Sequence, residues 1–168
     1  AVMVAEEQLK EADVVLVTYG DHPLYESKTY QDILEKHVSS NATITMLTTQ
    51  LPDYDDWRAM FWHWGRVVRN ATGDLEAVRE YKVCTDKEKE ITEVNNGMYC
   101  FDASWLWENV KNIKNDNPKQ EYYLTSLFEM ALAQGRKMDT VSCEPEYGIG
   151  VNTLEEVAIA EKLVCGRQ

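Results

Sequence analysis

A strand, a helix and a second strand follow one another near the N-terminus, and this order constrains the fold more than any other feature. Asp13 to Tyr19, DVVLVTY, is short, apolar and β-branched, which is typical of a strand buried on both faces. Ala42 to Leu51 is rich in Thr and Ile and predicts another strand. A helix with Ser27 as N-cap is expected between them, because apolar residues recur at helical spacing: Tyr30, Ile33, Leu34 and Val38. Such a βαβ unit predicts a parallel sheet with helices on its faces.

The remaining chain continues this mixture of strands and helices. Gly65 to Tyr81 predicts a β-hairpin in which Gly73 supplies the turn. Pro52 to Trp64 is dense in aromatic residues, and core packing, an interface and a cover for the sheet are open interpretations of it. No internal repeat or long linker divides residues 1–168, so one α/β domain is expected. Further strands are predicted at Glu93–Asp102 and Lys137–Cys143, and helices at Ala1–Asp13, Ala103–Ile113, Leu124–Gly135 and Thr153–Val164.

Charge and composition exclude several classes of function. Twenty-nine acidic residues against 17 basic ones leave a net charge of −12, which repels polyanions and argues against nucleic-acid binding. A phosphate-bearing ligand would need a cation or local hydrogen-bond donors. No apolar run approaches the roughly 18 residues of a membrane span, and no leader-like segment opens the sequence. With four scattered cysteines, expected to be reduced, this composition predicts a cytoplasmic protein without membrane contact.

Two short motifs place oxygen ligands where α/β proteins bind small molecules. YGDHP puts Asp21 after a glycine at the end of the first strand, where a carboxylate suits Mg²⁺. A cap on the turn into Pro23 is the alternative role for Asp21. GIGVNT puts Asn152 just before the last helix, where its amide either binds a ligand or caps the helix. The residues alone leave both alternatives open.

Five segments, in this order, carry a resemblance to a known family. They are VLVTYGDHPL, WGRVVRNATGDLEAVREYK, TDKEKEITEVNNGMYCFD, NDNPKQEYYLTSLFEMALAQGRKM and GVNTLEEVAIAEK. From Ala1 to about Lys162, the chain resembles the pyrophosphorylase domain of bacterial N-acetylglucosamine-1-phosphate uridylyltransferase, a sugar-phosphate nucleotidyltransferase. The resemblance implies a Rossmann-like, three-layer α/β/α nucleotide-diphospho-sugar transferase fold. A mixed, mainly parallel sheet with a β-hairpin insertion belongs to that expectation.

The resemblance also implies an activity and a cofactor. Family members transfer a uridylyl group from UTP to N-acetylglucosamine 1-phosphate and release pyrophosphate, and Mg²⁺ offsets the phosphate charge. By motif, Asp21 and Asn152 are the expected metal ligands and catalytic residues. Tyr19 and Gly20 are expected to line the nucleotide-sugar site beside them.

The sugar pocket is implied by the hairpin, the following strand and a later loop. A helix cap at the end of a solvated loop is the alternative role for Thr125, and Lys82 is either a phosphate contact or a solvated lysine. Polar side chains that bond the sugar hydroxyls would exclude a wrong sugar, because that sugar would leave them unpaired. The residues implied to contact or cover the sugar are Gly65, Glu80, Asn95, Glu121, Tyr123 and Thr125.

The sequence also departs from the family pattern. The family's Gly-rich nucleotide loop, of the kind G-x-G-T-R-M, has no counterpart, since the one Gly-x-Gly lies at Gly148–Gly150. We therefore expect a truncated domain, the C-terminal two-thirds of the family's, whose exposed sheet edge is covered by self-association or by a partner chain. Two functions stay open: a nucleotidyltransferase or its sugar- and metal-binding portion, and a non-catalytic sugar-nucleotide-binding or assembly module. Smaller departures are Lys119, Gln120, Ser126, Leu154 and Glu155.

Overall fold

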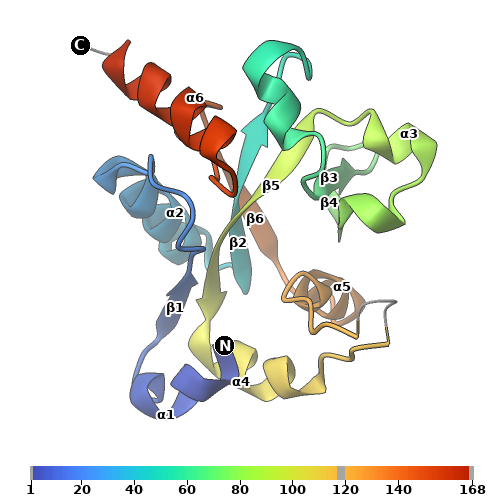
Figure 1. The fold of residues 1–168 in the computed structure, drawn as a ribbon. Coiled ribbons are helices and arrows are strands. Elements are labelled where there is room, and N and C mark those ends of the chain that lie inside the picture. The colour runs from blue at the N-terminus through green and yellow to red at the C-terminus, as the bar shows by residue number, and fades with distance from the viewer. Residues whose placement is uncertain (1, 117–119, 167–168) are drawn as a thin grey trace.

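A single six-stranded sheet runs through the computed structural model, which describes residues 2–116 and 120–166. The strand order is β4-β3-β5-β2-β6, and β1 pairs with the C-terminal part of β5 (Figure 1). The predicted hairpin is present, and its turn residue Gly73 has a φ of 89°. All predicted strands are found: β1 (Val14–Val17), β2 (Ile44–Gln50), β3 (Arg66–Arg69), β4 (Leu75–Arg79), β5 (Glu93–Asp102) and β6 (Met138–Cys143).

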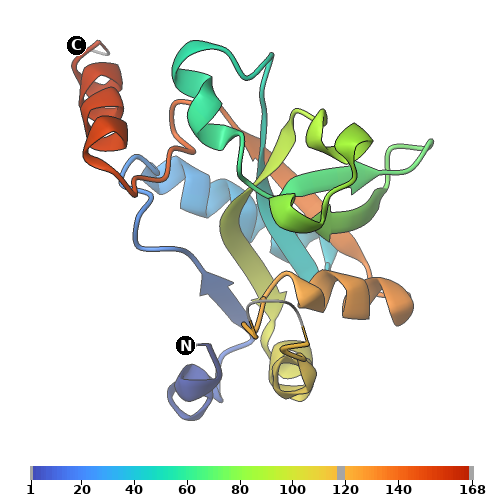
Figure 2. The ribbon, with the colours of Figure 1, turned by 45° about the vertical axis from the view of Figure 1, so that its right-hand side comes forward.

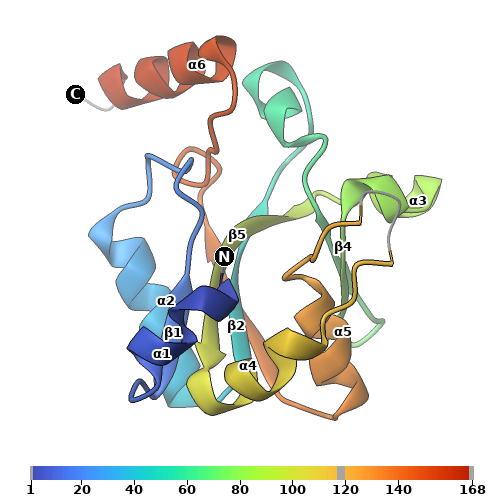
Figure 3. The same ribbon diagram turned by 60° about the horizontal axis from the view of Figure 1, so that its bottom comes forward.

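Helices cover both faces of the sheet. On one face, α2 (Ser27–Ser40) packs through Ile33 against β2 and β5. On the other face lie α4 (Ala103–Asn109) and α5 (Ser126–Ala133), which Figures 2 and 3 show close together. These layers confirm the predicted α/β/α arrangement. The remaining helical segments are η1 (Val2–Ala5), α1 (Glu6–Leu9), η2 (Asp56–Phe61), η3 (Tyr81–Val83), α3 (Asp86–Lys89), η4 (Val110–Asn112) and α6 (Leu154–Cys165).

β5 is the central strand, and it lies between β1 and β2. Val15 of β1 and Ile44 of β2 both pair with Phe101, from opposite sides. β1 and β2 therefore run parallel without touching, and both are antiparallel to β5. Among the described residues only β2 and β6 pair in parallel, yet β1, β2, β3 and β6 all run in the same direction. The sheet is therefore mixed, as predicted. The strand–helix–strand order makes β1 and β2 run in the same direction. They are not neighbours, because β5, which follows them in the sequence, lies between them.

The outer edge of β1 has no strand partner among the described residues. The expectation that a second chain covers this edge stays a prediction.

α2 buries a narrower stripe than its sequence predicts. Ile33 and His37 are buried, whereas Leu34 and Val38 are 43% and 64% exposed. The buried positions are four residues apart, so α2 rests on the sheet along one ridge. The cap position belongs to Glu26, and Ser27 is already helical. At the N-terminus the predicted helix is too long, because α1 ends at Leu9.

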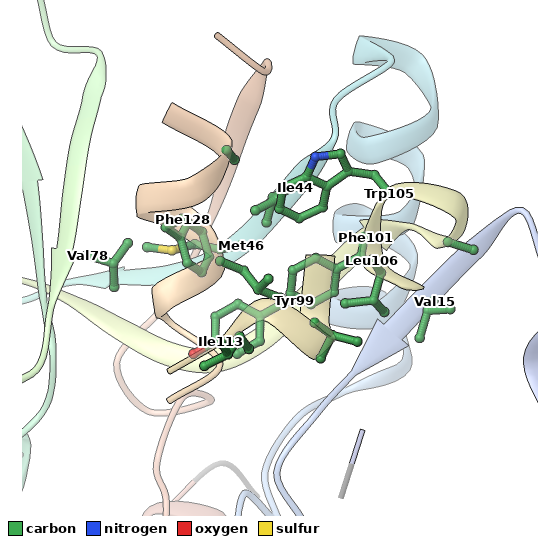
Figure 4. Close-up of a cluster of buried hydrophobic side chains, with 14 of the residues drawn as sticks. Val15, Ile44, Met46, Val78, Tyr99, Phe101, Trp105, Leu106, Ile113 and Phe128 are labelled. Atoms are coloured by element: carbon green, nitrogen blue, oxygen red, sulfur yellow. The ribbon is translucent and has the colours of Figure 1, made fainter. Parts of the chain in front are cut away.

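The main core lies between the sheet and helices α4 and α5 (Figure 4). Tyr99 and Phe101 of β5 are completely buried there, as are Leu106 of α4 and Phe128 of α5. The rings of Tyr99 and Phe128 meet edge to face with their centroids 5.6 Å apart. The packing of these rings anchors β5, in whose first half Glu93 and Asn95 are only half-buried.

The aromatic segment Pro52–Trp64 forms a second core, which confirms the core interpretation. Phe61 is completely buried, and Trp57 and Trp64 pack against its cluster together with Ile149. The four cysteines are all free thiols. No helix in the described part of the chain is long and apolar enough to cross a membrane.

Candidate functional site

A pocket of about 190 Å³ opens where the chain leaves β1 and where β5 begins. Its walls come from segments that are far apart in the sequence, because β5 brings the hairpin and the C-terminal turn to the end of β1. The fold thus gathers most of the residues implied by the resemblance at one place. The expected residues that line the pocket are Tyr19, Asp21, Gly65, Glu80, Asn95 and Asn152.

A backbone hydrogen bond joins the two segments expected to bind metal. The amide of Val151 donates to the carbonyl oxygen of Asp21 over 2.8 Å, which places Asp21 and Asn152 at the same pocket. The Oδ1 atom of Asp21 is buried and has no hydrogen-bond partner in the part of the chain that the structure describes. Because an unpaired buried carboxylate oxygen is costly, this atom is suited to a cationic ligand.

Asn152 is not the cap of α6, so that alternative is wrong. Thr153 takes the cap position, where its Oγ1 accepts from the amide of Glu156 over 3.2 Å. Glu156 Oε2 in turn accepts from the amides of Thr153 and Asn152, over 2.9 and 2.6 Å. This capping box leaves the exposed side chain of Asn152 available to a ligand.

His22 lines the pocket beside Asp21, although the sequence did not single it out. Its side chain is only 5% exposed, and it stacks on Tyr25 with ring centroids 5.0 Å apart. Burial lowers the pKa of His22, while the Asp21 carboxylate, 3.8 Å from Nε2, opposes that shift. The ring is therefore neutral near pH 7 and presents a dipole rather than a charge to Asp21.

Tyr19 lies against the backbone of Gly97. A Cβ atom on Gly97 would be 2.4 Å from Cδ2 of Tyr19, and Gly97 has a φ of 70°, which favours glycine. Burial raises the pKa of the Tyr19 hydroxyl, so it remains a neutral hydrogen-bond donor. A Cβ atom on the neighbouring Gly20 would meet nothing within 4 Å, so space alone does not require glycine there.

Asn95 is held by three hydrogen bonds near the N-terminal end of β5. Its amide donates to the carbonyl of Gly65 over 2.9 Å, and its Nδ2 donates to the hydroxyl of Tyr99 over 2.8 Å. Its Oδ1 accepts from the amide of Gly97 over 3.1 Å. One N–H and one oxygen lone pair of the Asn95 carboxamide therefore stay available for a ligand.

Glu80 and Thr125 are joined directly. The buried Thr125 hydroxyl donates to Glu80 Oε1 over 3.0 Å, and it makes no capping bond to α5. The helix-cap interpretation of Thr125 is therefore wrong for its side chain. This bond orients the carboxylate of Glu80, which lines the pocket. Thr125 itself is not among the described lining residues.

Replacing Thr125 by valine is expected to test this contact, because valine keeps the shape and removes the hydroxyl. Losing a hydrogen bond to a charged group is expected to cost about 1.5 kcal/mol in the free energy of unfolding, measured by urea denaturation. Thr140→Val is the matched control, since Thr140 bonds Arg69 away from the pocket. The affinity of the pocket for its ligand should fall in Thr125→Val and not in Thr140→Val. Equal affinities of the two variants would mean that the bond between Thr125 and Glu80 does not orient Glu80 for binding.

Some expected residues lie elsewhere. Glu121 is exposed and Tyr123 half-buried, and neither belongs to the described lining of the pocket. Lys82 is exposed at the end of the hairpin, and Lys119 lies outside the described residues. The covering role of Glu121 and Tyr123 therefore stays a prediction.

Several lining residues gave no recognisable signal in the sequence. Asn96 is 1% exposed, and its Nδ2 donates to the carbonyl of Gly148 over 3.2 Å. Gly150 admits no side chain easily, because a Cβ atom would lie 3.0 Å from Nε2 of His22. The only signal for the missed residues is that each lies within two positions of an expected site residue: Asp21, Gly65, Asn95 or Asn152. The residues missed are His22, His63, Trp64, Asn96, Gly97 and Gly150.

Comparison with known proteins identifies the family. The model of a family described as nucleotidyl transferase matches residues 1–145. The chain belongs to the nucleotidyl transferase family. Proteins described as "Bifunctional protein GlmU" are similar to it throughout. The one from Clostridium botulinum (strain Loch Maree / Type A3) is 35% identical over 162 residues, which are 96% of this chain and 34% of that protein.

A further relative gives the same alignment. The "Bifunctional protein GlmU" of Geobacillus sp. (strain WCH70) is 37% identical over 166 residues, which are 98% of this chain and 35% of that protein. This nucleotidyl transferase chain thus spans about a third of the length of the curated relatives it matches. The relatives and the family match confirm the resemblance seen in the sequence.

Solved structures confirm the nucleotide-diphospho-sugar transferase fold of this nucleotidyl transferase. A CMP:2-keto-3-deoxy-manno-octonic acid synthetase complexed with CTP superimposes with a TM-score of 0.68 at 16% identity, over 99% of this chain and 67% of that one. A putative glucose-1-phosphate thymidylyltransferase from Bacillus anthracis, in complex with a sucrose, gives a TM-score of 0.67 at 15% identity. That match covers 96% of this chain and 58% of the other.

Proposed function

We propose that this chain is the sugar- and metal-binding portion of a sugar-1-phosphate nucleotidyltransferase. The reaction proposed is UTP and N-acetylglucosamine 1-phosphate to UDP-N-acetylglucosamine and pyrophosphate. The observation that carries the proposal is the hydrogen bond from Val151 to Asp21, since it unites both expected metal ligands beside Glu80 and Asn95. The relatives and the family match support the reaction class.

The donor set of the pocket fits Mg²⁺. Asp21 offers a buried carboxylate oxygen without a hydrogen-bond partner among the described residues, and Asn152 offers an amide oxygen at the same pocket. Oxygen donors of this kind, few in number, suit a cation that keeps water and phosphate oxygens as its other ligands. Bound Mg²⁺ would supply charge neutralisation to the phosphates of the ligand. A protein of net charge −12 has particular need of it.

The other lining residues would bind and orient the sugar. Glu80 presents a carboxylate that Thr125 orients, and Asn95 keeps one donor and one acceptor for the ligand. Backbone at Gly65 approaches the same place, because the carbonyl of Gly65 is fixed by Asn95. These groups hold the sugar phosphate in one orientation, and positioning of this kind is a large part of phosphoryl-transfer catalysis.

Calorimetric titration of the chain with UDP-N-acetylglucosamine tests the proposal. In Mg²⁺ we expect binding, and in EDTA we expect affinity to fall by at least about tenfold, which corresponds to about 1.4 kcal/mol. Binding that is the same in EDTA would refute the metal site. Binding by the chain with no turnover of UTP and N-acetylglucosamine 1-phosphate would favour a non-catalytic sugar-nucleotide-binding module.

A further inference from the structure

Arg66, the first residue of β3, is a completely buried arginine. Arginine is almost never fully buried unless its charge is compensated. Here the guanidinium donates to three backbone carbonyls. Nη2 donates to Trp62 over 2.7 Å, Nη1 donates to Trp64, and Nε donates to Lys89 over 3.3 Å. Backbone carbonyls therefore satisfy its donors from two different stretches of chain.

Aromatic rings surround the same guanidinium. Its Cζ atom lies 4.9 Å from the ring centroid of Tyr54, 5.7 Å from that of Trp62 and 5.4 Å from that of Tyr81. A planar guanidinium stacks on such rings and is weakly hydrated, so it can remain in this environment where an ammonium would not. The cage formed by these three rings accounts for Tyr54 and Trp62 of the aromatic segment before β3, whereas Phe61 of that segment packs in the second core.

Arg66 and the rings around it connect two walls of the pocket, one at residues 62–65 and one at residues 80–81. The carbonyls of Trp62 and Trp64 stand on either side of His63, and His63, Trp64 and Gly65 line the pocket. The second wall is the end of the hairpin, where Tyr81 follows the pocket residue Glu80. The rings of His63 and Tyr81 meet edge to face with centroids 4.9 Å apart. Arg66 is thus the group that both walls contact, although it does not itself line the pocket.

We propose that Arg66 is a positioning residue that fixes the wall at residues 62–65 against the end of the hairpin and thereby sets the fit of the sugar. This inference rests on the proposed function, because it places the sugar of the proposed substrate against these two walls of the pocket. Lysine cannot replace Arg66 in this role, because its ammonium is a point charge without the planar fork that reaches three carbonyls and stacks on rings.

The substitution Arg66→Lys, with Arg66→Met as a second variant, tests the proposal. Arg69→Met is the matched control, because Arg69 lies on the same strand and pairs with Glu93 away from the pocket. Each protein is titrated with N-acetylglucosamine 1-phosphate and separately with inorganic pyrophosphate, both in Mg²⁺. We expect Arg66→Lys to lose about tenfold in affinity for the sugar phosphate and less than about twofold for pyrophosphate, whereas Arg69→Met changes neither. Equal losses for both ligands, or no loss in Arg66→Lys, would overturn the proposal.

Amide hydrogen exchange, measured without ligand, separates this inference from the proposed function. In Arg66→Lys the amides of Trp64 and Gly65 should exchange at least about tenfold faster than in the wild type, while those of β2 and the Arg69→Met control are unchanged. Unchanged exchange at Trp64 and Gly65 would refute the positioning role. If the wild type binds neither ligand, the proposed function fails, and the exchange rates still decide what Arg66 does.

Discussion

The substitution Gly97→Ala is expected to destabilise the protein by about 2 kcal/mol or more and to weaken ligand binding. A non-glycine residue in the left-handed region costs about 1–2 kcal/mol by itself. The added Cβ would also lie 2.4 and 2.5 Å from two ring atoms of Tyr19, so the ring must move. Because Tyr19 lines the pocket, its displacement should lower affinity for UDP-N-acetylglucosamine as well. Urea denaturation and calorimetric titration measure the two effects.

The change at Gly20 is the stability control for Gly97→Ala. A Cβ atom at Gly20 would meet nothing within 4 Å, and no positive φ favours glycine there. Gly20→Ala should therefore change the free energy of unfolding by less than about 0.5 kcal/mol. If Gly97→Ala proves as stable as Gly20→Ala, the close approach of Tyr19 to β5 is not a constraint on the fold.

The second large effect is expected for Asp21→Asn, which should weaken Mg²⁺-dependent binding of the nucleotide sugar by about 100-fold, or about 2.7 kcal/mol. The change removes the carboxylate charge at nearly constant shape. The free energy of unfolding should stay the same or rise, because the wild-type Oδ1 is buried without a hydrogen-bond partner among the described residues, and Nε2 of His22 is 3.8 Å away. Opposite changes in binding and stability would mark Asp21 as a residue kept for function.

Asp32→Asn removes the same charge from the surface of α2, where Asp32 pairs with Lys28, and serves as the control. Titrations in Mg²⁺ and in EDTA complete the design. Asp21→Asn should bind equally weakly in both, whereas Asp32→Asn should retain the dependence on Mg²⁺. Persistent Mg²⁺ dependence in Asp21→Asn would exclude Asp21 as the metal ligand.

Local structure was predictable from the sequence because its signals are local. The apolar run at Val14–Val17, the turn at Gly73 and the cap region before α6 each lie within a few residues of the element they define. The motifs around Asp21 and Asn152 could likewise be placed at one site, but only through the resemblance to a family. Spacing alone left both residues with capping roles as alternatives.

Properties that depend on distant neighbours were not predictable. The position of β5 between β1 and β2 depends on pairing between strands that are about half the chain apart for β1 and about a third for β2, which no local pattern encodes. Arginine is usually exposed, so the burial of Arg66 could not be inferred before its aromatic cage was known. His22 carries no motif of its own, and its role follows from Tyr25 and Asp21 beside it.

The hydrogen bond between Val151 and Asp21 also has a consequence for folding kinetics. Asp21 follows the first strand and Val151 precedes the last helix, so this contact closes a loop of about three quarters of the chain. Contacts of such long sequence separation carry a high entropic cost and form late. We therefore expect the pocket to form after the sheet. If this contact is absent from the folding nucleus, a ligand that bridges the two segments is expected to slow unfolding without accelerating folding.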